Sequence, residues 1–134
     1  VCEDAENLYF YIKTKEDITS YEKGDATFMN VLIHTSDELP SFEDYNFILN
    51  RTLENGKGSI EKSLGGFSFE KVGESEVYIQ GNVMTMKVPR SALGLEANSD
   101  MYFKVADHVT HPDDIMDYYV SGDVAPLGRL GYGY

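Results

Sequence analysis

The chain has 134 residues, and its 23 acidic and 11 basic side chains give a formal net charge of −12. A surface of that sign repels nucleic acid and anionic membranes, so we expect neither as a partner. No stretch approaches the 18 or so consecutive apolar residues of a membrane-spanning helix, and no signal peptide is recognisable. These features predict a soluble polypeptide.

The length fits one domain covering residues 1–134, large enough to bury roughly two thirds of the surface exposed in the unfolded chain. The sequence opens on Val1 without an initiator Met, so we expect a module cut from a larger multidomain protein. Cys2 is the only cysteine and closes no intrachain disulfide. A thiol paired with one of the three histidines is conceivable, but a terminal cysteine outside any nucleophile motif is more often incidental.

The first predicted strand covers residues 8–13, where Leu8, Phe10 and Ile12 alternate with outward-facing tyrosines and a lysine. The polar segment 14–25 contains glycine and reads as a loop. Residues 27–35 are a continuous run of β-forming residues, which is typical of a strand covered on both faces.

The later strands are predicted at residues 45–51, 59–64, 67–72, 76–88 and 101–107. The stretch 76–88 reads as a hairpin, because Gly81 and Asn82 can supply the positive φ angles of a tight turn. Pro89 ends that hairpin, and residues 91–95 offer at most one helical turn. Eight or nine short strands at spacings of about ten residues predict an all-β, antiparallel, jelly-roll-like sandwich.

The last third of the chain carries the most distinctive motifs. A strand ends in Pro89-Arg90, a Leu93-Gly94 turn follows, then a Lys-x-Ala-Asp strand at 104–107 and an Asp-x-Tyr-x-x-Gly-Asp-x-Ala-Pro type of ending at 117–126. This order resembles the bacterial β-sandwich domains related to family-nine carbohydrate-binding modules and DOMON domains. The opening strand and residues 45–51 are similar too, so the resemblance spans nearly the whole chain.

The resemblance implies a non-catalytic accessory module of a large secreted or cell-surface protein, with a polysaccharide or glycan as ligand. Sugar-binding members typically present Trp side chains as stacking platforms, and this chain has none, whereas it has seven Phe and ten Tyr. Sugar binding needs flat apolar rings together with planar polar groups. The candidate ligand-binding residues are Phe42, Tyr45, Arg51, Phe67, Asp107, Tyr118, Tyr119 and Arg129.

A second candidate site is a calcium site, because calcium takes six to eight oxygen ligands from a loop. The carboxylates that could supply them lie within eleven positions: Asp113, Asp114, Asp117 and Asp123. The structural alternative is that Asp113 or Asp114 caps a turn after Pro112 and that Asp123 holds the segment around it.

Two further classes are weighed against this reading. No nucleophile elbow, zinc-protease helix, P-loop or dinucleotide motif occurs, so we do not expect an enzyme. Haem binding through Met and His is known among DOMON domains, but methionines at alternating strand positions usually fill a core. The alternative function is a structural or interaction domain that packs on a neighbouring domain; it would bury the aromatic residues that a binder exposes beside Arg51 or Arg129.

Overall fold

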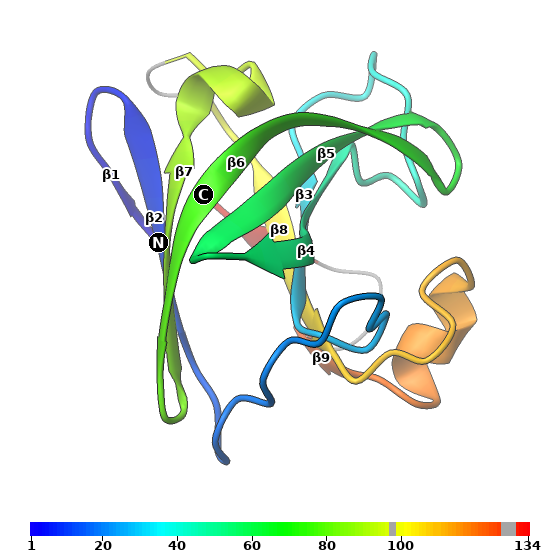
Figure 1. The fold of residues 1–134 in the computed structure, drawn as a ribbon. Coiled ribbons are helices and arrows are strands. Elements are labelled where there is room, and N and C mark those ends of the chain that lie inside the picture. Colours follow the sequence, from blue (N-terminus) through cyan, green and yellow to red (C-terminus); the bar gives the residue numbers. More distant parts are fainter. Residues whose placement is uncertain (97–98, 127–130) are drawn as a thin grey trace.

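The computed structural model describes residues 1–96, 99–126 and 131–134. The described residues form ten β-strands and two short 3-10 helices, with no α-helix among them, which confirms the all-β class (Figure 1). The elements are β1 (Cys2–Glu3), β2 (Asn7–Lys13), β3 (Asn30–His34), β4 (Phe47–Glu54), β5 (Lys57–Gly65), β6 (Ser68–Gln80), β7 (Val83–Pro89), η1 (Arg90–Leu93), β8 (Tyr102–Asp107), η2 (Ile115–Tyr119), β9 (Asp123–Ala125) and β10 (Tyr132–Gly133). None of the helices in this part of the chain is long and apolar enough to span a membrane.

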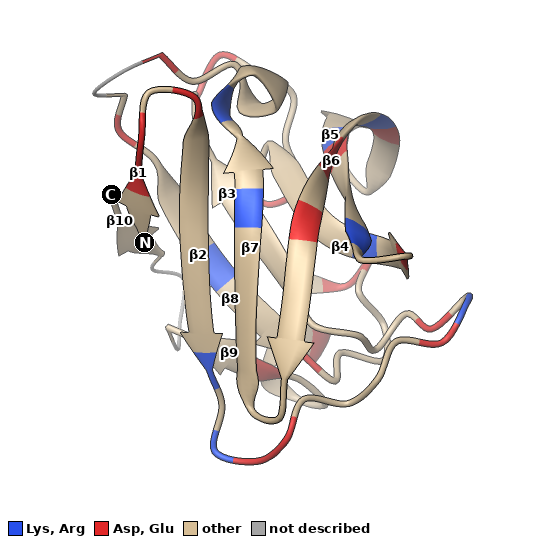
Figure 2. Cartoon of the chain, turned by 60° about the vertical axis from the view of Figure 1, so that its left-hand side comes forward, with Lys and Arg blue, Asp and Glu red and all other residues tan. Residues whose placement is uncertain are grey.

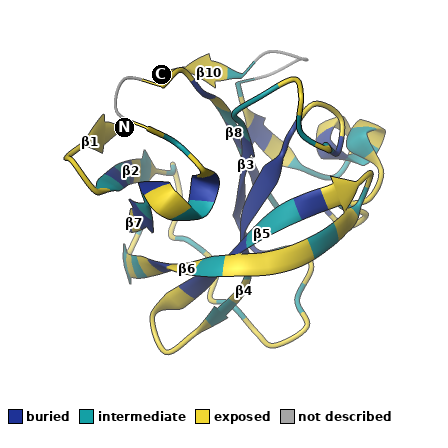
Figure 3. Ribbon diagram, turned by 90° about the horizontal axis from the view of Figure 1, so that it is seen from above, coloured by how far each residue is buried: buried dark blue, intermediate teal, exposed yellow. Residues whose placement is uncertain are grey.

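All ten strands belong to one antiparallel sheet in the order β1-β2-β7-β6-β5-β4-β3-β8-β10, and β9 also pairs with β8. Seen from above, this sheet curls strongly round a central core (Figure 3). The result is a half-barrel whose two ends are β2 with its short partner β1, and β8 with β9 and β10. The predicted strand number was slightly low because two-residue strands such as β1 and β10 leave no periodic pattern.

The β6–β7 hairpin forms where the alternating runs predicted it, with Glu76 opposite Lys87 and Gln80 opposite Val83. Gly81 has the expected positive φ of 59°. Asn82 was expected to share that conformation but does not. Its side-chain amide instead donates a 2.7 Å hydrogen bond to the carbonyl oxygen of Thr14, so Asn82 ties the hairpin to the end of β2.

The main core lies inside the curl of the sheet. Alternation along β2 turns Leu8 and Phe10 inward, and alternation along β7 turns Met84, Met86 and Val88 inward. The other core members come from the far end of the sheet and its flanking loops: Phe28, Met29, Val31, Ile33, Phe47, Leu49, Ile60, Leu93 and Met101. Four of the five methionines therefore fill the core, as the structural reading of these residues predicted.

A second core cluster covers the opposite face of β3, β4 and β8. Leu32, Ile48 and Ala106 point to this side and pack with buried residues of the connecting loops: Phe42, Tyr45, Val109, Tyr118 and Val124. Consequently β3 is apolar on both faces, as the continuous run at 27–35 predicted. Residues 47–50 of β4 are buried on both faces for the same reason.

The loop after β3 is organised by Asn46, which is fully buried. Its amide oxygen accepts hydrogen bonds from the backbone N–H groups of Thr35 at 2.7 Å and Ser36 at 3.0 Å. Its amide nitrogen donates to the carbonyl oxygen of Pro40 at 3.1 Å. One side chain thus fixes both ends of the loop that brings Phe42 over the second core cluster.

Candidate functional site

Three of the aromatic residues predicted to bind sugar lie inside the protein. Phe42, Tyr45 and Tyr118 are buried in the second core cluster. The hydroxyl of Tyr118 donates a 2.9 Å hydrogen bond to the carbonyl oxygen of Pro112. Burial raises the pKa of Tyr118, and it raises the pKa of Tyr45 to about 12. These rings hold the loops together and offer no exposed platform.

Arg51 and Phe67 lie beside one another on the β4–β5–β6 part of the sheet. The Arg51 guanidinium lies 5.0 Å from the ring centre of Phe67 and 5.1 Å from that of Phe69, and it pairs with Glu61 at 3.3 Å. Those contacts are cation–π interactions and a partly exposed ion pair. The two residues also border a hollow of about 370 Å³ near Tyr21.

Tyr119 is the exposed member of the predicted set on η2. Its hydroxyl is 3.1 Å from the ammonium of Lys104, whose nitrogen also lies 5.3 Å from the Tyr119 ring centre. Lys104 itself is fully buried. Tyr119, Tyr45 and Lys104 line a hollow of about 210 Å³ that is separate from the one beside Arg51.

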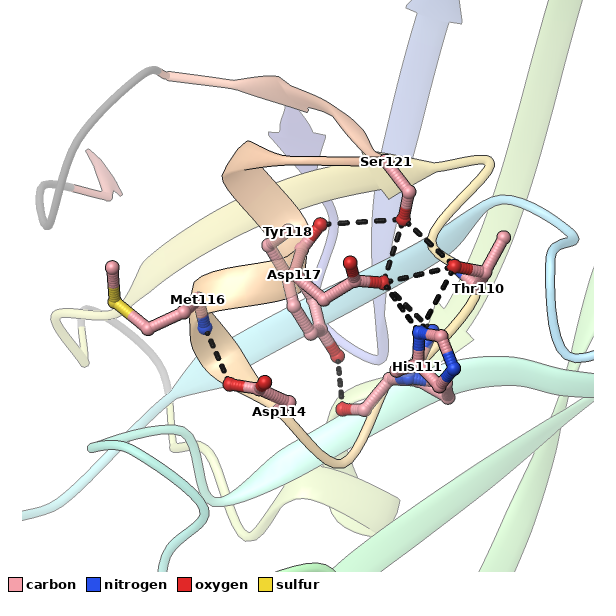
Figure 4. Close-up of polar contacts among 8 residues, drawn as sticks. Thr110, His111, Asp114, Met116, Asp117, Tyr118 and Ser121 are labelled. Atoms are coloured by element: carbon pink, nitrogen blue, oxygen red, sulfur yellow. Dashed lines mark hydrogen bonds and ion pairs between the residues drawn. The ribbon is translucent and has the colours of Figure 1, made fainter.

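The predicted calcium ligands on η2 serve the backbone instead (Figure 4). Asp114 caps the helix by accepting a 3.0 Å hydrogen bond from the backbone N–H of Met116. The Asp117 carboxylate accepts from the Ser121 hydroxyl at 2.6 Å, the His111 backbone N–H at 2.8 Å and the Thr110 hydroxyl at 3.0 Å. The Ser121 bond is the main reason that the pKa of Asp117 falls to about 2.

The structural alternative is therefore confirmed for Asp114. Asp113 is exposed, and Asp123 lies apart from η2, opposite Asp107 in the β8–β9 pair. Among the described residues, no three His, Cys, Asp or Glu side chains are grouped in a way that could hold a metal ion.

Asp107 and Asp123 face a hollow of about 510 Å³ between β2 and the β8–β9 pair. Burial raises the pKa of the Asp107 carboxyl, and the carboxylates of Asp123 and Asp25 raise it further, while neighbouring His108 lowers it. Arg129 lies outside the described residues. The predicted site residues are thus distributed over three hollows and a core cluster, and they do not meet in one site.

The exposed aromatic surface lies elsewhere, on the outer face of β2, β7 and β6 (Figure 2). Tyr11 on β2 and Tyr78 on β6 are 63% and 65% exposed. Both are the register partners of Thr85 on β7, so the two rings flank one threonine in a single row across three strands. Two strand spacings separate them by about 10 Å.

The next row across the same strands adds polar groups. Tyr9 and Glu76 are the register partners of Lys87. The Tyr9 hydroxyl donates a 2.7 Å hydrogen bond to Asp4, which is the largest reason that the pKa of Asp4 falls to about 2. Glu76 pairs with Lys57 at 3.3 Å, whereas no ion pair within the described residues involves Lys87. The two rows line a shallow groove of about 580 Å³, here called the tyrosine groove.

The sequence did contain a signal for the tyrosine groove. The alternation along 8–13 predicted Tyr9 and Tyr11 to face outward, and the hairpin at 76–88 placed Tyr78, Thr85 and Lys87 on one face of its two strands. The missing information was that β2 pairs with β7, because strands distant in sequence meet only through tertiary packing.

Comparison of the sequence with protein-family models and with curated proteins, and of the structure with solved structures, found no match.

Proposed function

We propose that this domain is a non-catalytic carbohydrate-binding module and that the tyrosine groove is its binding surface. The observation that carries the proposal is the pair Tyr11 and Tyr78, two of the most exposed large side chains of the described residues, aligned on either side of Thr85. A pyranose ring offers an apolar C–H face and a rim of hydroxyls. A tyrosine ring matches the first, and its hydroxyl can hydrogen-bond with the second.

The polar groups of the groove suit the rest of a sugar chain. Thr85 provides a hydroxyl between the two rings, and Lys87 provides up to three donors in the neighbouring row. The groove is open along the sheet and is not an enclosed pocket, so it favours the interior of an extended polysaccharide. The net charge of −12 favours a neutral or basic glycan over an acidic one.

The motif resemblance supports the wider setting of this proposal. We place the domain in a larger extracellular bacterial protein, as an accessory module of the kind found among family-nine carbohydrate-binding modules and DOMON domains. Its sandwich character belongs to the same proposal: β2, β7 and β6 on one side and β3 and β8 on the other enclose the main core between them.

The alternative is a structural or interaction domain without a small-molecule site. The burial of Phe42, Tyr45 and Tyr118 favours it, because a binder that used these rings would expose them. The two candidates differ in what they require of Tyr11 and Tyr78, since only glycan binding gives these exposed rings a role.

The test is an affinity-gel and glycan-array screen of the folded domain against neutral, basic and acidic polysaccharides, with calcium and again with a chelator. For any glycan retained, Tyr11→Ala and Tyr78→Ala should each weaken binding about tenfold, or about 1.4 kcal/mol. Tyr102→Ala is the matched control, because Tyr102 is 53% exposed but lies on β8, away from the groove.

Silence of the folded domain across the whole panel would favour the structural alternative. Binding that survives both groove substitutions would move the glycan site elsewhere. Loss of binding with the chelator would show that a metal ion takes part, which the Asp114 and Asp117 contacts do not favour.

A further inference from the structure

The edge of β2 is open beside one of the hollows. Hydrogen bonds from the backbone N–H of Arg90 to the carbonyl of Glu6, and from that of Thr14 to the carbonyl of Asn82, frame the β2–β7 ladder. In an antiparallel ladder only alternate residues bond to a given neighbour. The even-numbered residues of β2 therefore bond to β7, and Tyr9, Tyr11 and Lys13 direct their backbone groups to the other side.

That other side is only partly occupied. β1 pairs with β2 at Leu8 and Tyr9 and goes no further. Within the described residues, no strand pairs there with Tyr11 or Lys13. Two residues of a well-formed strand thus present backbone donors and acceptors at an exposed edge, the arrangement to which another extended chain adds.

A slot runs along this edge and separates it from the far end of the sheet. Its volume is about 510 Å³, and it is lined on one side by residues 10–15 and on the other by residues of β8, β9 and β10. At its apolar end the Phe10 and Phe103 rings meet edge to face, with centres 5.3 Å apart. Tyr132 packs on Phe103 at 5.4 Å. In Figure 3 this is the opening between β2 and β8 in the curled sheet.

The other end of the slot is charged with opposite signs on its two sides. Lys13 and Lys15 lie on the β2 side, and Asp107 and Asp123 on the β8–β9 side. No ion pair joins these lysines to these aspartates. Both sides are therefore able to pair with charges of a molecule lying between them.

We propose that the slot binds an extended polypeptide segment of a partner protein, which adds as a strand to the edge of β2. Its backbone pairs with Tyr11 and Lys13, an apolar side chain lies on Phe103 and Tyr132, and an acidic and a basic side chain meet the lysine and aspartate sides. Alternating main-chain donors and acceptors along β2 match a peptide and not a sugar chain. A second copy of the domain fits less well, because a slot lined on both sides admits one strand and not the edge of a sheet.

This inference goes beyond the proposed glycan binding and rests on other groups. Glycan binding depends on the Tyr78 and Tyr11 rings on the outer face, whereas peptide binding depends on the backbone of β2. Either can fail without the other.

The experiment selects ligands for the folded domain from a phage library of random linear peptides, and then measures the affinity of a synthetic peptide of the enriched sequence. Amide hydrogen exchange by NMR is recorded with and without this peptide. We expect the amides of Tyr11 and Lys13 to exchange fast in the free domain and at least tenfold more slowly in the complex, while those of Phe10 and Ile12 are protected in both.

A pair of variants separates backbone from side chain. Lys13→Pro removes the outward N–H, and proline is tolerated at an edge strand when that N–H faces away from its neighbour. Lys13→Ala removes the charge and keeps the N–H. We expect at least a tenfold loss of peptide affinity in Lys13→Pro and a severalfold loss in Lys13→Ala.

Three results would overturn the inference: no enriched sequence, peptides that leave the Tyr11 and Lys13 amides unprotected, or fast-exchange amides that prove already protected in the free domain. Protection that depends on protein concentration without peptide would assign the edge to a second copy. Wild-type exchange data decide the matter even if Lys13→Pro does not fold.

Discussion

At the scale of single residues, the acidic side chains of this domain are put to structural use. Asp117 is the clearest case, because three donors from Thr110, His111 and Ser121 converge on its carboxylate (Figure 4). These bonds hold the chain on either side of η2 together. They favour the ionised carboxylate and so lower its pKa to about 2.

The lowered pKa predicts how stability depends on pH. In the unfolded chain an aspartate titrates near 3.9, so the stabilisation by Asp117 is complete above about pH 4 and is lost as pH falls toward about 2. Asp117→Asn should therefore be less stable than the wild type at pH 7, and the difference should shrink over that window. Urea unfolding of both proteins from pH 2 to pH 7 measures it. A difference that stays constant with pH would show that the charge of Asp117 does not matter.

At the scale of elements, the β4–β5 pair contains a tight contact at its irregularity. The register shifts between Leu49 and Leu53, and Asn50 adopts a positive φ of 66° there. Asn50 is fully buried, so the Asn-Arg-Thr acceptor that it begins is inaccessible in the folded domain. Gly58 on β5 lies against it, and a Cβ at position 58 would come within 2.2 Å of the Asn50 amide oxygen.

Gly58→Ala should accordingly destabilise the domain by about 1–3 kcal/mol, the usual range for overpacking a well-filled interior. Gly133→Ala is the matched control on β10, because its Cβ would meet nothing closer than Tyr102 at 3.6 Å. Neither glycine has a positive φ, so backbone strain does not enter the comparison. Chemical unfolding of the two variants decides it; equal stabilities would mean that the Asn50 side chain moves aside at little cost.

At the scale of the whole molecule, the excess of acidic groups is the dominant electrostatic feature. The net charge of −12 is spread over a small domain, and the ion pairs within the described residues are few and mostly exposed. Such pairs contribute little to stability. Self-repulsion of the folded state should therefore outweigh their attraction.

Salt should stabilise this domain as a consequence. Raising sodium chloride from about 10 mM to about 150 mM shortens the screening length from about 30 Å to about 8 Å. A gain of about 1 kcal/mol would raise Tm by roughly 4 °C for a domain of this size. Calorimetry across this range, with potassium chloride as a check on ion specificity, measures the effect. A Tm that falls with salt would show that the ion pairs outweigh the repulsion.

Much of the element structure could be predicted because strand alternation and turn residues are local properties. The inward faces of β2 and β7, the hairpin at Gly81 and the single turn after Pro89 all follow from residues close together in the sequence. The continuous run at β3 likewise predicted its burial on both faces. Local pattern could not show that a second core cluster covers that strand.

The candidate site was harder to predict, because an aromatic residue in a loop looks the same whether it is buried or exposed. Phe42, Tyr45 and Tyr118 were expected to face solvent, yet the loops fold back and bury them over β3, β4 and β8. Conversely, Tyr78 and Thr85 joined Tyr11 only through the pairing of β2 with β7.

The sequence alone therefore determined the all-β class, the positions of most strands and the acidic surface, since these depend on composition and on neighbours along the chain. Only the tertiary structure decided which strands pair, which aromatic rings stay exposed and where the edge of β2 remains open. Those features depend on contacts between residues far apart in the sequence, and a single sequence carries no direct record of such contacts.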